Sequence, residues 1–332
     1  MPSRDNGSNR DTRPPPRIRG RASWRLLGRL TSPPTLRNTT AGRGRLAGAV
    51  CGNVVVVTGA SYGLGAAIAR QVGDAGAIVV ICARSTEQLT EVAQSIRARG
   101  GRAHAYPVDL ADERAVREFA AQVLREHGHV DVLVHNAGKS MNRGLHLSYR
   151  RPRDLNAIAG VNYLGPVRLT MALLPYMRER RAGHIINIST AGVLAFPFPR
   201  WGFYLSTKKA FEWWLRSVAP EIRPDGVVCT QYYLGHVYTR MSAPDRLLRR
   251  VPGQTPEAAA RGVARAMVRR PRAAAYWPLY LAHPLLEALR FPLERLSAPY
   301  VRTAETRESL MAAVPQTGLV LDEPAADPEQ VS

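Results

Sequence analysis

The chain has 332 residues, 45% of them hydrophobic, and a formal net charge of +20. This length and composition exclude a chain that is disordered throughout, because it can bury a substantial core. The three cysteines lie far apart, without the spacing of a zinc site or a disulfide framework. We therefore expect no metal site, and we expect a reducing, cytoplasmic environment.

The distribution of the positive charge argues against nucleic acid as the main partner. Residues 1–48 hold eleven arginines against two aspartates, and therefore nine of the twenty net charges. This segment is rich in proline and glycine and has no periodic apolar pattern, so we expect it to be disordered. An arm that binds nucleic acid or a membrane is the alternative. The acidic end, residues 312–332, is expected to be disordered as well.

From residue 50 onward, short apolar runs alternate with helical patterns, which is typical of βαβ units. The sequence therefore predicts an α/β fold with a doubly wound parallel sheet. We expect strands over residues 53–58, 77–83, 102–108, 130–136, 184–189 and 226–233. We expect helices over residues 63–76, 85–99, 111–127, 152–180 and 203–219, the fourth of them kinked or broken at Pro166 and Pro175. No run of about 18 uncharged apolar residues occurs, which predicts no transmembrane helix.

The pattern loosens after residue 240. Thr255 and Pro256 give the start signal of a further helix. An apolar segment interrupted by prolines and charges follows it. We expect residues 50–240 to form the catalytic domain, and residues 241–311 to be a loop and helical extension of that domain.

A glycine-rich turn follows the first predicted strand, in the sequence "TGASYGLG". Gly59, Gly63 and Gly65 allow the backbone to turn tightly and to approach a pyrophosphate, whose charge then lies at a helix N-terminus. Placed after the first strand of a βαβ run, the turn predicts a dinucleotide site. Ser61, Tyr62 and Leu64 belong to the same turn and are expected to contact the cofactor.

The end of the second strand bears on the choice of cofactor. A carboxylate there would bind a free ribose 2′-hydroxyl, but the chain has Ala83, followed by Arg84 and Ser85. A guanidinium can bind a 2′-phosphate in bidentate fashion, so the sequence favours NADP(H) over NAD(H). The alternative is that Arg84 is a solvated loop charge.

Polar residues also follow the third and fourth strands. They are Asp109 and the run Asn136, Ala137 and Gly138. Ligands of such sheets bind at the carboxyl ends of the strands, so these residues are expected on the cofactor side. Asp109 fits a helix N-cap equally well.

These motifs, with Asn162 in "GVNYLGP", Ser189 in "NISTAG" and "YLSTK" from Tyr204 to Lys208, resemble the short-chain dehydrogenase/reductase family over residues 50–240. The resemblance implies a Rossmann-type fold and a role for each catalytic position. Tyr204 would be the general acid/base and Lys208 would hold the nicotinamide ribose. Ser189 would bind the carbonyl oxygen, and Asn162 would anchor a water relay. Thr190 is the competing hydroxyl, but Ser189 stands three places before Gly192, as the motif requires.

The chemistry of the Tyr204 and Lys208 pair can also be argued from the residues. Side chains at positions i and i+4 of a helix lie on the same face. A tyrosine has an unperturbed pKa near 10, and a nearby cation lowers that value, which suits a proton donor at neutral pH.

The segment after the sixth strand, "YLGHVYT", departs from the family pattern because Leu234 stands where a proline is common. Gly235, Val237 and Thr239 still fit the pattern. The resemblance implies that these three contact the cofactor, with Thr239 at the nicotinamide carboxamide.

The substrate is expected between the segments 139–150, 193–203 and 234–250. The candidate lining residues are Leu145, His146, Phe196, Phe198, Trp201 and His236. An apolar, aromatic lining suits a lipophilic substrate. The alternative is that these rings pack in the core or in a subunit contact.

The C-terminal part resembles, more weakly, that of bacterial fatty acyl-CoA reductase-like proteins. We therefore expect an NADPH-dependent reductase of a lipophilic aldehyde, ketone or acyl thioester. A dehydrogenase of a steroid- or polyketide-like alcohol is the alternative, and a catalytically silent NADP-sensing protein is an alternative of another class. The resemblance also implies a homo-oligomer. The apolar C-terminal segment fits a peripheral membrane contact or a cap over the active site, and it fits a packed helix pair or dimer contact equally well.

Overall fold

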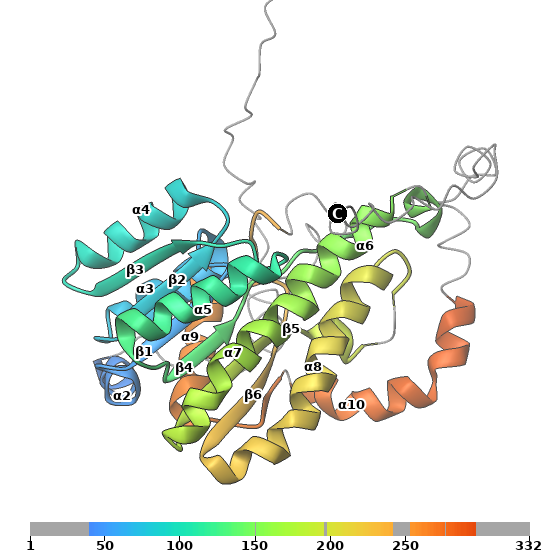
Figure 1. Ribbon diagram of the computed structural model, residues 1–332. Coiled ribbons are helices and arrows are strands. Elements are labelled where there is room, and N and C mark those ends of the chain that lie inside the picture. Colours follow the sequence, from blue (N-terminus) through green and yellow to red (C-terminus); the bar gives the residue numbers. More distant parts are fainter. Residues whose placement is uncertain (1–39, 150, 196–197, 242–252, 276, 297–332) are drawn as a thin grey trace, which may run out of the picture.

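The computed structural model describes residues 40–149, 151–195, 198–241, 253–275 and 277–296. These residues form a seven-stranded sheet between two layers of helices (Figure 1). All six pairs of neighbouring strands are parallel. The predicted α/β, doubly wound architecture is confirmed.

The strand order is β3-β2-β1-β4-β5-β6-β7. The strands are β1 Val54–Thr58, β2 Ile78–Ala83, β3 Arg102–Pro107, β4 Val132–His135, β5 Gly183–Thr190, β6 Val227–Leu234 and β7 Ala273–Ala274. The first six lie within two residues of their predicted bounds, and the short β7 was not predicted. After β3 the chain crosses the sheet to place β4 beside β1, and this reversal marks where such sheets bind ligands.

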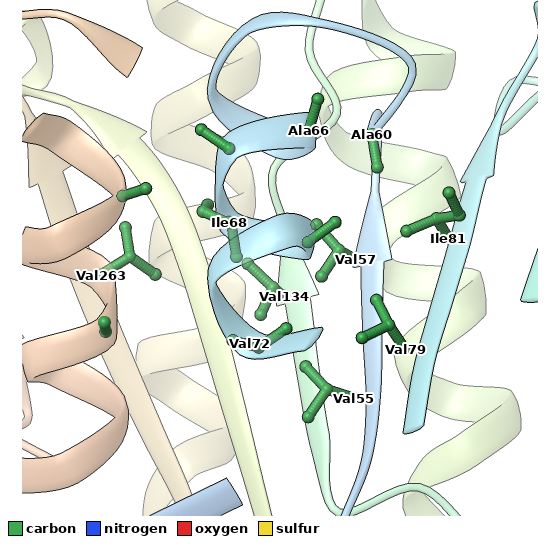
Figure 2. Close-up of a cluster of buried hydrophobic side chains, with 14 of the residues drawn as sticks. Val55, Val57, Ala60, Ala66, Ile68, Val72, Val79, Ile81, Val134 and Val263 are labelled. Carbon is green, nitrogen blue, oxygen red and sulfur yellow. The ribbon is translucent and has the colours of Figure 1, made fainter. Parts of the chain in front are cut away.

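The helices cover both faces of the sheet (Figure 1). They are α2 Thr40–Val50, α3 Gly63–Gly73, α4 Thr86–Arg97, α5 Glu113–His127, α6 Pro152–Ala159, α7 Gly165–Glu179, α8 Gly202–Ile222, α9 Pro256–Arg269 and α10 Trp277–Ala288. On one face α2, α3, α4 and α9 share a core cluster, and on the other α5, α7 and α8 share a second one. In Figure 2, Ile68 of α3 has the strand residues Val57 and Val134 on one side and Val263 of α9 on the other.

Helix α2 corrects one expectation. We expected residues 1–48 to be disordered, yet residues 40–48 belong to this helix. Leu46 and Val50 are 2% and 1% exposed and lie in the core cluster shared with α9. Two apolar side chains at i and i+4 are too few to stand out as a periodic pattern in an arginine-rich segment. They are nevertheless enough to pack one face of the helix against the core. Residues 1–39 and 312–332 lie outside the described residues.

The predicted fourth helix, 152–180, is interrupted once. A π-helical turn, Gly160–Leu164, separates α6 from α7, and the N–H of Gly165 donates to the carbonyl of Gly160. Pro166, which has no N–H, follows directly, so the expected break lies beside this proline. Pro175 is accommodated inside α7 without a break.

The run Pro152–Glu179 is also long and apolar enough to cross a membrane by length and composition alone. Core helices pass the same test. This run packs on the sheet, with Leu169, Leu173 and Met177 at most 1% exposed.

The segment after residue 240 contributes one helix, α9, to the core and a second helix, α10, to the surface beside the end of β5. Thr255 caps α9 as predicted, because its side chain accepts a hydrogen bond from the N–H of Ala258. Helix α10 lies beside the end of β5, where the ring nitrogen Nδ1 of His283 is 3.0 Å from the carbonyl oxygen of Leu194. Leu279 joins the small apolar cluster of Val193, Leu194 and Tyr233. The extension thus reaches the segment predicted to bind substrate.

Candidate active site

The glycine-rich turn lies at the carboxyl end of β1, where only glycine fits. Gly59 has φ +67°, and a Cβ added to it would lie 2.7 Å from the Cα of Ala137. A Cβ on Gly65 would lie 2.3 Å from the carbonyl oxygen of Gly59. The turn therefore brings its backbone N–H groups to the N-terminus of α3 without side chains in the way. This cradle fits the pyrophosphate of a dinucleotide.

The segment after β4 holds this turn in place. The side-chain nitrogen of Asn136 donates to the carbonyl oxygens of Thr58, at 2.9 Å, and Gly59, at 3.1 Å. The hydroxyl oxygen of Thr58 in turn accepts the backbone N–H groups of Asn136 and Ala137. Asn136 and Ala137 therefore shape the cofactor cradle, which is a structural contribution that their motif did not reveal.

The other predicted cofactor residues lie along the same edge of the sheet. Arg84 is exposed after β2, and Ser85 is the N-cap residue of α4. Asp109 accepts a hydrogen bond from the N–H of Ala111 at 3.0 Å. Asp109 thus closes a turn after β3 and is not the helix N-cap of the alternative, because the N-cap of α5 is Asp112. Its role toward a cofactor remains a prediction.

Tyr204 and Lys208 stand one turn apart on α8, as predicted. The ammonium of Lys208 is buried and donates to the carbonyl of Ile188 in β5 at 3.1 Å. Burial lowers the pKa of Lys208 to about 8. Burial also raises the pKa of Tyr204, and a hydrogen bond to the hydroxyl of Thr190 opposes that rise. In the absence of a cofactor, the neutral phenol is therefore the favoured form of Tyr204.

The two hydroxyls at the end of β5 have different surroundings. Ser189 is 2% exposed, and its hydroxyl has no hydrogen-bond partner among the described residues. The hydroxyl of Thr190 is hydrogen-bonded with that of Tyr204 and accepts the N–H of Gly192 at 3.2 Å. The hydroxyl that affects the pKa of Tyr204 is therefore that of Thr190, the neighbour of the residue that the motif selected. Successive strand residues face opposite sides, so a shift by one position changes which hydroxyl faces Tyr204.

Asn162 lies in the π-helical turn and is 1% exposed. Its side chain exchanges two hydrogen bonds with the backbone of Lys139, at 2.8 and 2.9 Å. It also donates to the hydroxyl of Thr207, which is on α8 between Tyr204 and Lys208. Asn162 therefore joins the segment after β4 to the catalytic helix α8. Its part in a water relay stays a prediction.

The loop after β6 lies over the glycine-rich turn. Val237 pairs with Gln254, and a Cβ on Gly63 would lie 3.3 Å from the side chain of Thr239. Gly235 begins this loop. The loop therefore keeps its place on the cofactor side although Leu234 stands where proline is common.

The predicted substrate residues differ in exposure. Leu145 and Phe198 are 61% and 52% exposed, whereas His146 is 4% exposed. The ring of Trp201 lies 5.7 Å from the ring of Tyr204. The ring of His236 lies 5.1 Å from that of Tyr238. Phe196 lies outside the described residues.

One backbone hydrogen bond joins two of the substrate segments, and a side chain of α10 contacts one of them. The N–H of Arg143 donates to the carbonyl of Arg200 at 2.9 Å, and His283 of α10 contacts Leu194. The sequence left open whether the C-terminal segment caps the active site, and it gave no signal that His283 would be the residue in contact with Leu194. It also gave no signal for the position of Arg240, whose guanidinium lies over the ring of Tyr62.

A family model described as short chain dehydrogenase matches residues 53–248. The chain belongs to the short-chain dehydrogenase/reductase family of oxidoreductases.

The chain is similar to several bacterial members of this family. An uncharacterised oxidoreductase of Mycobacterium tuberculosis is 43% identical over 229 residues, which cover 68% of this chain and 67% of the relative. A fatty acyl-CoA reductase of Acinetobacter baylyi is 40% identical over 223 residues, covering 67% of this chain and 75% of the relative.

Two solved structures resemble the chain in fold and sequence. A metagenomic short-chain oxidoreductase in complex with NADP has a TM-score of 0.59 and 35% identity, covering 67% of this chain and 93% of its own. A short-chain dehydrogenase from Streptomyces avermitilis has a TM-score of 0.64 and 30% identity, covering 77% of this chain and all of its own.

Proposed function

We propose that the chain is an NADP(H)-dependent reductase of a lipophilic carbonyl compound, such as a long-chain aldehyde, a ketone or an acyl thioester. The observation that carries this proposal is the contact between the hydroxyls of Tyr204 and Thr190 beside the buried Lys208. The three groups stand at the edge of the sheet that also carries the glycine-rich turn. A proton donor, a second hydroxyl and a cation are thereby gathered next to a dinucleotide cradle.

Tyr204 is the proton donor in this mechanism. When bound, the dinucleotide would supply the hydride for the carbonyl carbon. Tyr204 gives its proton to the carbonyl oxygen as negative charge develops there, which turns an aldehyde or ketone into an alcohol. From an acyl thioester the same step gives a hemithioacetal, which releases the aldehyde with the thiol as leaving group. The hydroxyl of Thr190 accepts the N–H of Gly192, and a carbonyl oxygen bound between the two hydroxyls would take the proton that Thr190 otherwise shares with Tyr204. Thr190 therefore takes the carbonyl-binding role that the family resemblance gave to Ser189.

Lys208 makes the loss of the tyrosine proton easier. With a pKa of about 8, its amine is still mostly protonated at pH 7. The positive charge stabilises a tyrosinate on the same helix face. One of its three N–H donors is used on Ile188, and the others are available for the nicotinamide ribose.

The choice of NADP(H) is supported by the exposed Arg84 after β2, where no carboxylate would repel a 2′-phosphate. The solved relative with bound NADP is consistent with it. A lipophilic substrate is supported by the exposed Leu145 and Phe198 and by the ring of Trp201 beside Tyr204. The fatty acyl-CoA reductase of Acinetobacter baylyi points to the same substrate class.

The proposal is tested by following NADPH and NADH oxidation with long-chain aldehydes, acyl-CoA thioesters, steroid ketones and small polar ketones. We expect turnover with the long-chain compounds and a higher kcat/KM with NADPH than with NADH. Turnover restricted to small polar ketones would contradict the lipophilic substrate. Oxidation of a steroid alcohol with no reduction of any long-chain compound would favour the dehydrogenase alternative.

A further inference from the structure

The loop after β6 places a cation at the mouth of the glycine-rich turn. The guanidinium carbon of Arg240 lies 5.4 Å from the centre of the Tyr62 ring. Tyr62 is the residue before Gly63 in that turn, and its side chain is 41% exposed. Thr239, the residue before Arg240, packs its methyl group toward Gly63. Two consecutive residues of the loop therefore lie on two consecutive residues of the turn.

The backbone just before Arg240 is fixed. Tyr238 donates its N–H to the carbonyl of Gln254 at 3.0 Å, and the N–H of Gln254 donates to the carbonyl of His236 at the same distance. The hydroxyl of Tyr238 also accepts the N–H of Gly253 at 2.8 Å. Because this ladder ends two residues before Arg240, the guanidinium is carried by an ordered backbone.

The glycine-rich turn needs a cation from elsewhere. A diphosphate carries two negative charges at neutral pH, and a helix N-terminus supplies only about half a positive charge. The turn itself, residues 59–65, contains no lysine, arginine or histidine. The first basic residue of α3 is Arg70, whose side chain donates to Ser95 of α4 at 3.1 Å. Arg240 forms no ion pair with a carboxylate within the part of the chain that the structure describes.

We propose that Arg240, seated on the ring of Tyr62, binds the diphosphate of the nicotinamide dinucleotide. The inference rests on the proposed function and adds to it a cofactor-binding residue that lies outside the glycine motif. A guanidinium can bind two phosphate oxygens at once through N–H groups that lie in one plane, and the Tyr62 ring attracts this cation to the turn. A lysine would supply the charge without this two-point geometry.

The test compares Arg240→Ala with Arg84→Ala, because the two arginines are assigned to different phosphates. Dissociation constants for NADPH and NADH are measured by calorimetry without substrate. We expect Arg240→Ala to weaken both dinucleotides by a similar factor, about tenfold or more. Arg84→Ala should weaken NADPH alone, since NADH has no 2′-phosphate. Tyr62→Ala removes the ring beneath Arg240 and should weaken both dinucleotides by a smaller factor than Arg240→Ala does.

Each other result counts against the inference. Unchanged affinity of Arg240→Ala for both dinucleotides would overturn it, and so would a loss confined to NADPH, which would assign Arg240 to the 2′-phosphate. A wild-type chain that binds neither dinucleotide would overturn the proposed function itself. Thermal melting of the free variants accompanies the titrations. An Arg240→Ala protein that melts with the wild type but binds as weakly as expected excludes misfolding as the cause.

Discussion

The end of β5 carries two hydroxyls in adjacent positions, and the two have different hydrogen-bonding surroundings. Thr190 contacts Tyr204, whereas the hydroxyl of Ser189 is buried with no partner among the described residues. The motif spacing selected Ser189 because it counts residues back from Gly192. Spacing in the sequence does not show toward which face of the sheet a side chain points. Adjacent residues of a strand point to opposite faces, so an assignment that is off by one residue selects the wrong hydroxyl.

Substituting each residue in turn tests whether Thr190 or Ser189 is the hydroxyl that binds the carbonyl oxygen. We expect Thr190→Ala to lower kcat by roughly 100-fold, because a donor to the developing oxyanion is lost. Thr190→Ser should recover most of this loss. Ser189→Ala should change kcat by less than about threefold, since an unpaired hydroxyl is removed. Steady-state kinetics with the best substrate of the screen decide, and a large loss in Ser189→Ala with none in Thr190→Ala would restore the motif assignment.

The burial of Lys208 has a consequence for stability. Its pKa falls from 10.5 to about 8 on folding, so between these values the folded protein has released a proton that the unfolded chain still binds. Unfolding then takes up a proton, and the free energy of unfolding rises with pH across this window. The rise relative to a variant without the amine is on the order of 3 kcal/mol at most.

Lys208→Met tests this linkage. Urea unfolding of the cofactor-free proteins at pH 7.5 and pH 10 gives the two free energies of unfolding. We expect the wild type to gain stability relative to Lys208→Met as the pH rises. Other groups titrate alike in both proteins, so the pH dependence of the difference between their free energies of unfolding reflects the titration of Lys208. A difference that stays constant with pH would mean that burial does not lower this pKa.

At the scale of elements, the π-helical turn sets the position of Asn162. Its flanking glycines pack closely against the segment after β3. A Cβ on Gly165 would lie 2.2 Å from the carbonyl oxygen of Leu110, and one on Gly160 would lie 2.7 Å from the Cβ of Ala111. The turn is thereby pressed onto the same segment that carries Asp109. The helix thus changes its pitch where it must approach the cofactor side of the sheet.

Gly165→Ala should reveal this contact. The added methyl meets backbone atoms, which cannot turn aside, so we expect a loss of about 1–3 kcal/mol in the free energy of unfolding. Gly48→Ala on α2 is the matched control, because nothing lies within 4 Å of its added Cβ. The control should gain up to about 1 kcal/mol from helix propensity. Chemical denaturation measures both, and equal stabilities would contradict the close approach.

Most elements could be predicted because each carries its own pattern. The buried strands read as continuous apolar runs, and the helices between them show clear periodicity. The elements that escaped depend on tertiary contacts. β7 has two residues and exists through pairing with Gln231 and Tyr232 of β6. Helix α2 shows no apolar stripe beyond Leu46 and Val50. The π turn results from Pro166 and close packing together, of which only the proline is visible in the sequence.

At the scale of the whole molecule, the boundary of the folded domain lies earlier than composition suggested. The family model begins at residue 53, yet α2 places Leu46 in the core. The arginine-rich composition of residues 1–48 therefore conceals a short helix that belongs to the domain. Composition averages over a segment, whereas a domain boundary depends on single buried side chains.

Two truncations test this boundary. Removing residues 1–39 should leave the melting temperature and the NADPH-dependent activity unchanged, since α2 is kept. Removing residues 1–48 deletes Leu46 as well, and we expect Tm to fall by roughly 5 °C or more. Calorimetry of the two proteins decides. Equal melting temperatures would show that α2 contributes nothing to stability.

The hydrogen bonds around Asn136 affect how tightly a cofactor can bind. Asn136 bonds to Thr58 and Gly59, and Ala137 bonds to Thr58, all within the protein, so the cradle has its shape before any ligand arrives. The conformational entropy of this turn is lost during folding and is not lost again on association. A dinucleotide therefore meets a rigid receptor, and the heat capacity change on binding should reflect only the surface that it covers.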